Sequence, residues 1–67
     1  MSENDKRIWL LAAVVEDCKI KWGKSGSEVF NKMRAVGADS YILDGYDLLH
    51  TQSIEYIIED VEEMLGG

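Results

Sequence analysis

The chain has 67 residues with 13 acidic and seven basic side chains, a net charge of −6, and a single cysteine. This length allows one domain at most, and one cysteine excludes an internal disulfide and fits a reducing compartment. The charge is unevenly spread, with a net of +2 over residues 1–34 and −8 over residues 35–67, which contain no Lys or Arg. The second half is therefore poorly suited to nucleic acid or an anionic membrane, and it would suit a basic partner.

The longest apolar run, residues 8–15, has eight residues, whereas a membrane-spanning helix needs about 20. Residues 1–7 have no net side-chain charge and no small-residue cleavage site follows the run, so it does not resemble a secretory leader. We therefore predict a cytoplasmic protein that makes no membrane contact.

The first predicted helix starts at a cap on Asn4 or Asp5, with residues 1–4 frayed, and ends at Gly23. Its main apolar face has helical spacing and consists of Ile8, Leu11, Ala12, Val15, Cys18 and Trp22. Further apolar residues widen this face nearly all the way round, which is typical of a helix covered on all sides. Because so small a chain offers little cover, we predict self-association or a protein partner. Trp9 falls off the main face and is predicted to be an exposed anchor.

Two short helices are predicted next. Ser25 and Glu28 form the pattern of a capping box for a helix that runs to Val36 and is closed by Gly37. The residues expected to be buried there are Val29, Phe30, Met33 and Val36. Asp39 is then expected to cap a helix over residues 40–44, with Tyr41 and either Ile42 or Leu43 pointing inward, which Gly45 ends with a positive φ.

The last predicted helix has the most regular apolar pattern in the chain and begins at Thr51 or Ser53. Its apolar positions are Ile54, Ile57, Ile58, Val61, Met64 and Leu65, and its outer face carries Glu55, Glu59, Asp60, Glu62 and Glu63. Together these segments predict an all-α fold, a small bundle of three main helices plus one short helix, with residues 1–67 as a single domain.

The segment from residue 44 to residue 52 contains the only histidine and joins two predicted helices. Asp47 and His50 could pair across a turn, with Tyr46 or Thr51 nearby, as general acid–base chemistry requires. No motif places a nucleophilic serine or cysteine beside His50, and the chain has no phosphate-binding glycine loop. We therefore predict that the protein is not an enzyme. We expect Leu48 and Leu49 to pack this joint against the core, and His50 either to stabilise the joint or to face a partner. A ligand-binding or minor enzymatic domain centred on Asp47 and His50 is the alternative.

Other kinds of site are weakly indicated. No ligand pair has zinc spacing and nothing resembles a calcium loop, so we expect neither metal nor cofactor. Cys18 lies on the apolar face and is expected to be buried and inert. A helix-turn-helix domain, with Lys24, Lys32 and Arg34 meeting phosphates, is a second alternative, but the chain lacks a clear basic face.

The sequence also resembles a known family. Residues 45–52 read Gly-Tyr-Asp-Leu-Leu-His-Thr-Gln, and residues 55–61 read Glu-Tyr-Ile-Ile-Glu-Asp-Val. Both segments, and the start of the second helix at residues 25–29, are similar to those of short bacterial domains of unknown function. The resemblance implies an all-helical fold and, because the genes of that family often lie beside genes for ADP-ribosyltransferase-like domains, a role as the small partner of a toxin-like enzyme.

These observations lead to one prediction of function. We expect a small protein-interaction domain, with an antitoxin-like role as one form of it, that binds a protein partner or forms a homo-oligomer. The predicted interface consists of Trp9, Tyr46, Asp47, His50, Thr51 and Gln52. The sequence does not identify the partner.

Overall fold

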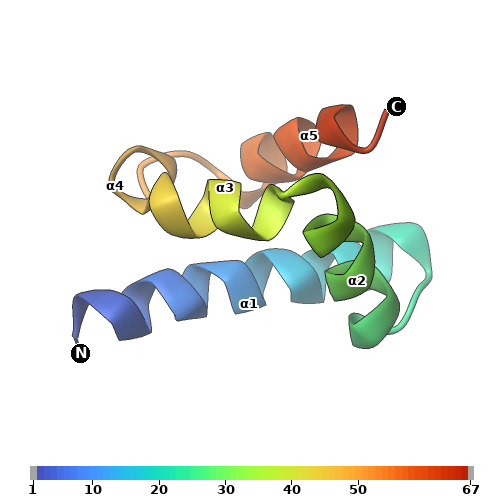
Figure 1. Ribbon diagram of the computed structural model, residues 1–67, viewed down its shortest axis with the longest axis horizontal. Coiled ribbons are helices and arrows are strands. Elements are labelled where there is room, and N and C mark those ends of the chain that lie inside the picture. The colour runs from blue at the N-terminus through green and yellow to red at the C-terminus, as the bar shows by residue number, and fades with distance from the viewer. Residues whose placement is uncertain (1, 67) are drawn as a thin grey trace.

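The computed structural model describes residues 2–66, which form five helices and, within that range, no strand (Figure 1). The elements are α1 (Glu3–Trp22), α2 (Gly26–Val36), α3 (Ala38–Asp44), α4 (Tyr46–Leu49) and α5 (Ile54–Met64). The predicted all-α bundle is confirmed. The structure adds the single turn α4 at the place where the sequence predicted only a joint.

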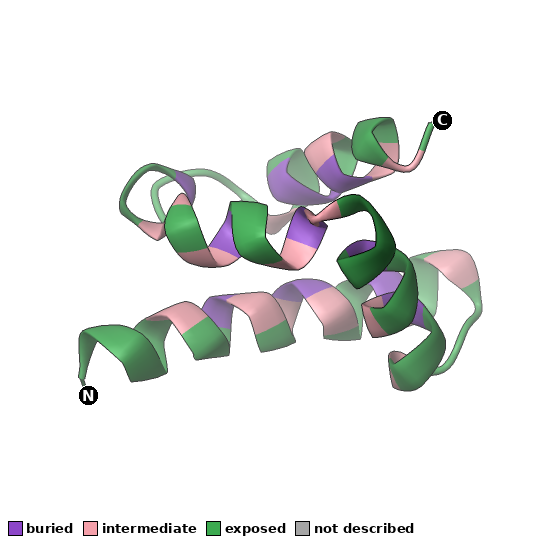
Figure 2. Ribbon diagram, viewed as in Figure 1, coloured by how far each residue is buried: buried purple, intermediate pink, exposed green. Residues whose placement is uncertain are grey.

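Helix α3 lies between α1 and α5, and α2 crosses the C-terminal part of α1 (Figure 1). All five helices contribute to one core, and their buried positions turn toward one another (Figure 2). The core consists of Leu10, Val14, Cys18, Val29, Met33, Ala38, Ile42, Leu49, Ile57, Ile58 and Val61.

The start of α1 differs from the prediction. Ser2 is the cap, and its hydroxyl accepts a hydrogen bond from the Asp5 amide at 3.2 Å. Asn4 and Asp5, the predicted caps, are inside the helix, where an acidic first turn favours the helix dipole. Met1 lies outside the described residues.

The buried face of α1 is also displaced from the prediction. Leu10, Val14 and Cys18 face the core, whereas Ile8 is exposed and Leu11 is half-buried. The two faces are about 100° apart on the helix, one residue of rotation. Because α1 is apolar nearly all round, its sequence does not decide between these faces, and packing against α3 and α5 does.

The ends of α2 follow the local signals. Ser25 and Glu28 form the predicted capping box, and Gly37 ends the helix at φ 77°. Val29 and Met33 are buried as predicted, but Phe30 is half-buried and Val36 is exposed. The bundle therefore buries only one narrow side of α2, the side of Val29 and Met33.

Helix α3 begins at Ala38, so Asp39 lies in its first turn and does not cap it. Ile42 is buried, whereas Tyr41, predicted to point inward, is exposed. Gly45 follows at φ −91°, which corrects the predicted positive φ. A different constraint acts on this glycine: the chain turns directly into α4 with almost no room beside it.

In α4 and α5 the buried positions are again a subset of those predicted. Leu49 is buried, but Leu48 is 78% exposed and does not pin the joint to the core. Ser53, one of the two predicted caps, accepts from the Tyr56 amide, and Met64 in the last turn is exposed. The described part of the chain holds no helix with the length and apolar character that crossing a membrane requires.

Candidate interaction surfaces

The joint around α4 is held to the start of α1 by Arg7. Its Nη1 donates to the Leu43 carbonyl at 2.9 Å, and its guanidinium carbon lies 6.0 Å from the centre of the Tyr46 ring. Tyr46 stacks on His50 with ring centres 4.9 Å apart and planes at 16°. A basic side chain near the C-terminus of a helix can satisfy a carbonyl that has no partner within the helix. Arg7, Tyr46 and His50 therefore fix the geometry of the joint.

The predicted pairing of Asp47 with His50 is not formed. The two ion pairs among residues 2–66 are Lys19 with Glu16 and Lys21 with Glu62. Asp47 and His50 are both exposed, and His50 lies flat on Tyr46. This arrangement leaves the imidazole without the orienting carboxylate that acid–base catalysis needs.

The remaining residues of the joint serve the backbone. The Thr51 hydroxyl donates to the Leu48 carbonyl at 2.7 Å, and the backbone N–H of Gln52 donates to the Leu49 carbonyl at 3.0 Å. Both side chains are otherwise exposed. Within residues 2–66, no group of three or more His, Cys, Asp or Glu side chains is placed to hold a metal ion.

Trp9 is 64% exposed, in agreement with its prediction as an exposed residue. It does not share a surface with the α4 joint, because two residues of helix turn Trp9 about 200° away from Arg7. The predicted interface is therefore divided in two. One part is the α4 joint, residues 44–52, and the other is Trp9. Trp9 belongs to what we call the outer face of α1, which consists of Trp9, Ala12, Glu16 and Ile20, all of them exposed.

At the C-terminal end of α1, three side chains tie that helix to α5. The Trp22 indole donates to Glu62 Oε2 at 3.0 Å, and Lys21 Nζ donates to Glu62 Oε1 at 2.8 Å. These hydrogen bonds lower the pKa of Glu62, and the bond from Lys21 has the larger effect. Beside them is an open cavity of about 370 Å³ that Lys24 and Lys32 also line.

The lowered pKa of Glu62 predicts a dependence of stability on pH. A carboxyl group with a depressed pKa in the folded state stabilises the fold above its unfolded pKa, near 4.5, and this contribution is lost as the pH falls through the folded pKa. We expect Lys21→Met to raise the pKa of Glu62 toward 4.5 and to shrink the difference in unfolding free energy between neutral and acidic pH. Side-chain carboxyl NMR and urea unfolding measure both quantities.

Lys6→Met is the matched control, because it removes the same charge from an exposed position near the other end of α1. It should leave the pKa of Glu62 in place. A Glu62 titration that Lys21→Met does not shift would contradict the assignment.

A groove between α3 and α5 is the feature that sequence reasoning did not predict. Its volume is about 470 Å³, and it is lined by Tyr41, Asp60, Glu63 and Met64. The Tyr41 hydroxyl donates to Asp60 Oδ2 at 2.6 Å, and this hydrogen bond, with a smaller effect of burial, raises the pKa of Tyr41 to about 12. The acidic face of the last helix was visible in the sequence, but its position beside Tyr41 depends on tertiary packing.

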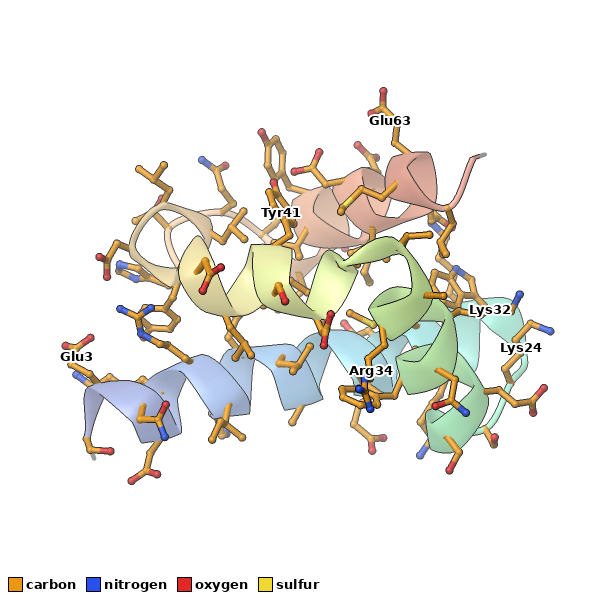
Figure 3. The ribbon with its side chains drawn as sticks, in the orientation of Figure 1. Glu3, Lys24, Lys32, Arg34, Tyr41 and Glu63 are labelled. Carbon is orange, nitrogen blue, oxygen red and sulfur yellow. The ribbon has the colours of Figure 1, made fainter. Side chains whose placement is uncertain are left out.

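Cys18 and the basic residues on and beside α2 are the remaining candidate residues of the sequence. Cys18 is buried, and burial raises the pKa of its thiol to about 11, which disfavours the reactive thiolate. Lys24, Lys32 and Arg34 lie on and beside α2 (Figure 3). The helix that follows, α3, carries two aspartates and no basic residue, so it is poorly suited to enter a DNA groove.

Comparison with known proteins gives one match. A family model described as a protein of unknown function (DUF3791) matches residues 10–66. The matched range contains all of α2 to α5 and leaves out Trp9. No curated protein and no solved structure matches the chain.

Proposed function

The chain belongs to the DUF3791 family, and we propose that it is a protein-binding domain whose main contact surface is the outer face of α1. The observation that carries the proposal is the exposure of large apolar side chains on this helix: Trp9 is 64% exposed and Ile20 83%. Tryptophan is enriched among the residues that dominate binding energies. Large apolar side chains that the bundle leaves uncovered favour a role in binding another protein.

The resemblance to domains encoded beside ADP-ribosyltransferase-like genes supports a particular class of partner. In this form of the proposal the chain is the small, antitoxin-like partner of a toxin-like enzyme. The α4 joint, with Tyr46, Asp47, His50, Thr51 and Gln52, is the second candidate contact surface, on another side of the molecule.

Co-expression of the tagged chain with the product of the neighbouring gene tests this proposal. We expect the two proteins to co-purify and the wild-type chain to protect cells from the enzyme. Trp9→Ala should weaken binding at least about 30-fold, the effect of removing a central interface residue. Ile20→Ala should weaken it less.

Leu48→Ala probes the second candidate surface, because Leu48 is 78% exposed and lies on α4, away from the outer face of α1. Binding that Leu48→Ala weakens and Trp9→Ala does not would move the contact surface to the α4 joint. A failure of the two proteins to co-purify, with no protection of cells, would overturn the antitoxin-like form of the proposal.

Self-association is the other way to cover this face, and we propose it separately. Sedimentation equilibrium of the wild type should show an oligomer that Trp9→Ala dissociates. A strict monomer at high concentration would refute it.

A further inference from the structure

The groove between α3 and α5 has an apolar lining contributed by both helices. Its apolar residues are Tyr41 of α3, which is 37% exposed, and Met64 of α5, which is 38% exposed. In Figure 3, Tyr41 rises from α3 toward α5, and Glu63 points from α5 away from α1. The groove therefore opens on the side of the bundle opposite α1 and is independent of the outer face of that helix.

Two carboxylates stand on this lining without a basic partner in the described part of the chain. Asp60 is held by the Tyr41 hydroxyl, which contacts only its Oδ2 atom. Glu63 is exposed, and neither residue belongs to the two ion pairs that residues 2–66 contain. Residues 35–67 include no Lys or Arg at all. The two carboxylates of the groove are therefore available to a basic group of another molecule.

An apolar lining with unneutralised carboxylates matches a cation carried on an aliphatic stem. Arginine fits better than lysine, because its planar guanidinium stacks on tyrosine rings and offers two parallel donors to a carboxylate. We propose that the groove binds an arginine side chain presented by an apolar segment of another protein, with the guanidinium on Asp60 and Glu63 and its neighbours on Tyr41 and Met64.

The identity of the partner at the outer face of α1 has no bearing on this assignment. The groove and that face are on different helices and can be disabled separately. Failure of Trp9→Ala to weaken partner binding would leave the groove untouched, and failure of the groove variants would leave the outer face of α1 untouched.

The test uses the full chain and a fluorescent peptide of alternating leucine and arginine, with twin peptides in which lysine or citrulline replaces arginine. Citrulline keeps the shape of arginine and lacks its charge. We expect binding to weaken several-fold with lysine and at least about tenfold with citrulline. On addition of the arginine peptide, NMR signals of Tyr41 and of the Met64 methyl group should shift.

Two double variants separate specific contact from general attraction to an acidic protein. Asp60→Asn with Glu63→Gln removes the groove charges, and Glu55→Gln with Glu59→Gln removes two charges elsewhere on the same helix, α5. The side chain of Asn in Asp60→Asn can still accept the hydrogen bond from the Tyr41 hydroxyl, so the double variant of the groove should fold normally. We expect the groove pair to weaken peptide binding about tenfold and the control pair less than about threefold.

Three results would overturn the proposal. The first is equal weakening by the two double variants, which would indicate non-specific attraction. The second is a set of NMR shifts confined to other helices. The third is self-association of the wild type that the groove pair abolishes, which would assign the groove to a second copy, with Lys32 or Arg34 of its α2 as the cation.

Discussion

Ile57→Ala is expected to lower the free energy of unfolding by about 3 kcal/mol, because it removes a fully buried side chain and leaves a cavity. A domain this small and without disulfides has only about 3–5 kcal/mol of stability in total. The variant should therefore lie at or near its unfolding midpoint at room temperature. Urea unfolding followed by tryptophan fluorescence measures the loss.

Ile20→Ala makes the same chemical change at an exposed position within another helix, α1. No cavity forms there, and alanine has the higher helix propensity, so stability should stay the same or rise by a few tenths of a kcal/mol. Ile57→Val supplies a milder step at the buried site, with an expected cost of about 1 kcal/mol. Equal effects of the two alanine variants would contradict the assigned core.

Several signals that act within a few residues were read correctly from the sequence, whereas the predicted caps at Asn4 or Asp5 and at Asp39, and the positive φ at Gly45, were wrong. The capping box of Ser25 and Glu28, the stop at Gly37 and the cap at Ser53 are all formed. Each depends on a side chain and a backbone amide three residues away, or on the conformation of a single glycine. Such features need no knowledge of how the helices pack.

Choices that depend on packing were read less well. The apolar pattern of α1 fits two faces, and the neighbours of that helix select the one with Leu10 and Val14. Tyr41 and Leu48 are apolar enough for the core, yet the helices carrying them, α3 and α4, each bury only a narrow side. Sequence periodicity marks the candidates for burial, and the bundle is too small to accept all of them.

The same division holds for the candidate surfaces. The exposure of Trp9 could be predicted, because the residue stands off the main apolar pattern of its own helix. The separation of Trp9 from the α4 joint, and the groove beside Tyr41, depend on contacts between α1, α3, α4 and α5. No pattern within one helix contains that information.

Gly45→Ala is expected to cost about 2 kcal/mol, the typical effect of forcing an extra methyl group into a filled space. A Cβ atom at this position would lie 2.8 Å from the Tyr41 carbonyl oxygen and 3.2 Å from Leu49 Cδ1. The carbonyl cannot move aside freely, because it accepts the Gly45 amide at 2.9 Å. Urea unfolding of the variant measures the cost.

Gly37 supplies the control, because a substitution there is unfavourable through its backbone conformation and not through lack of space. It has φ 77° and no atom within 4 Å of an added Cβ, so Gly37→Ala should cost about 1 kcal/mol through backbone strain alone. Asparagine tolerates the left-handed conformation, so Gly37→Asn should recover part of this loss. At position 45 asparagine should do no better than alanine, since the obstacle there is space. Recovery by asparagine at both positions would contradict this distinction.

The strain at position 45 should also reach the α4 joint. Relief of the contact with the Tyr41 carbonyl requires α4 to move away from the end of α3, and Tyr46 moves with it. The stacking of Tyr46 on His50, and the hydrogen bond from Arg7 to Leu43 on the other side of the glycine, would then be disturbed together. Ring-current shifts of His50 protons should therefore change in Gly45→Ala and stay constant in Gly37→Ala. If partner binding depends on the α4 joint, Gly45→Ala weakens it even under conditions where the variant is fully folded.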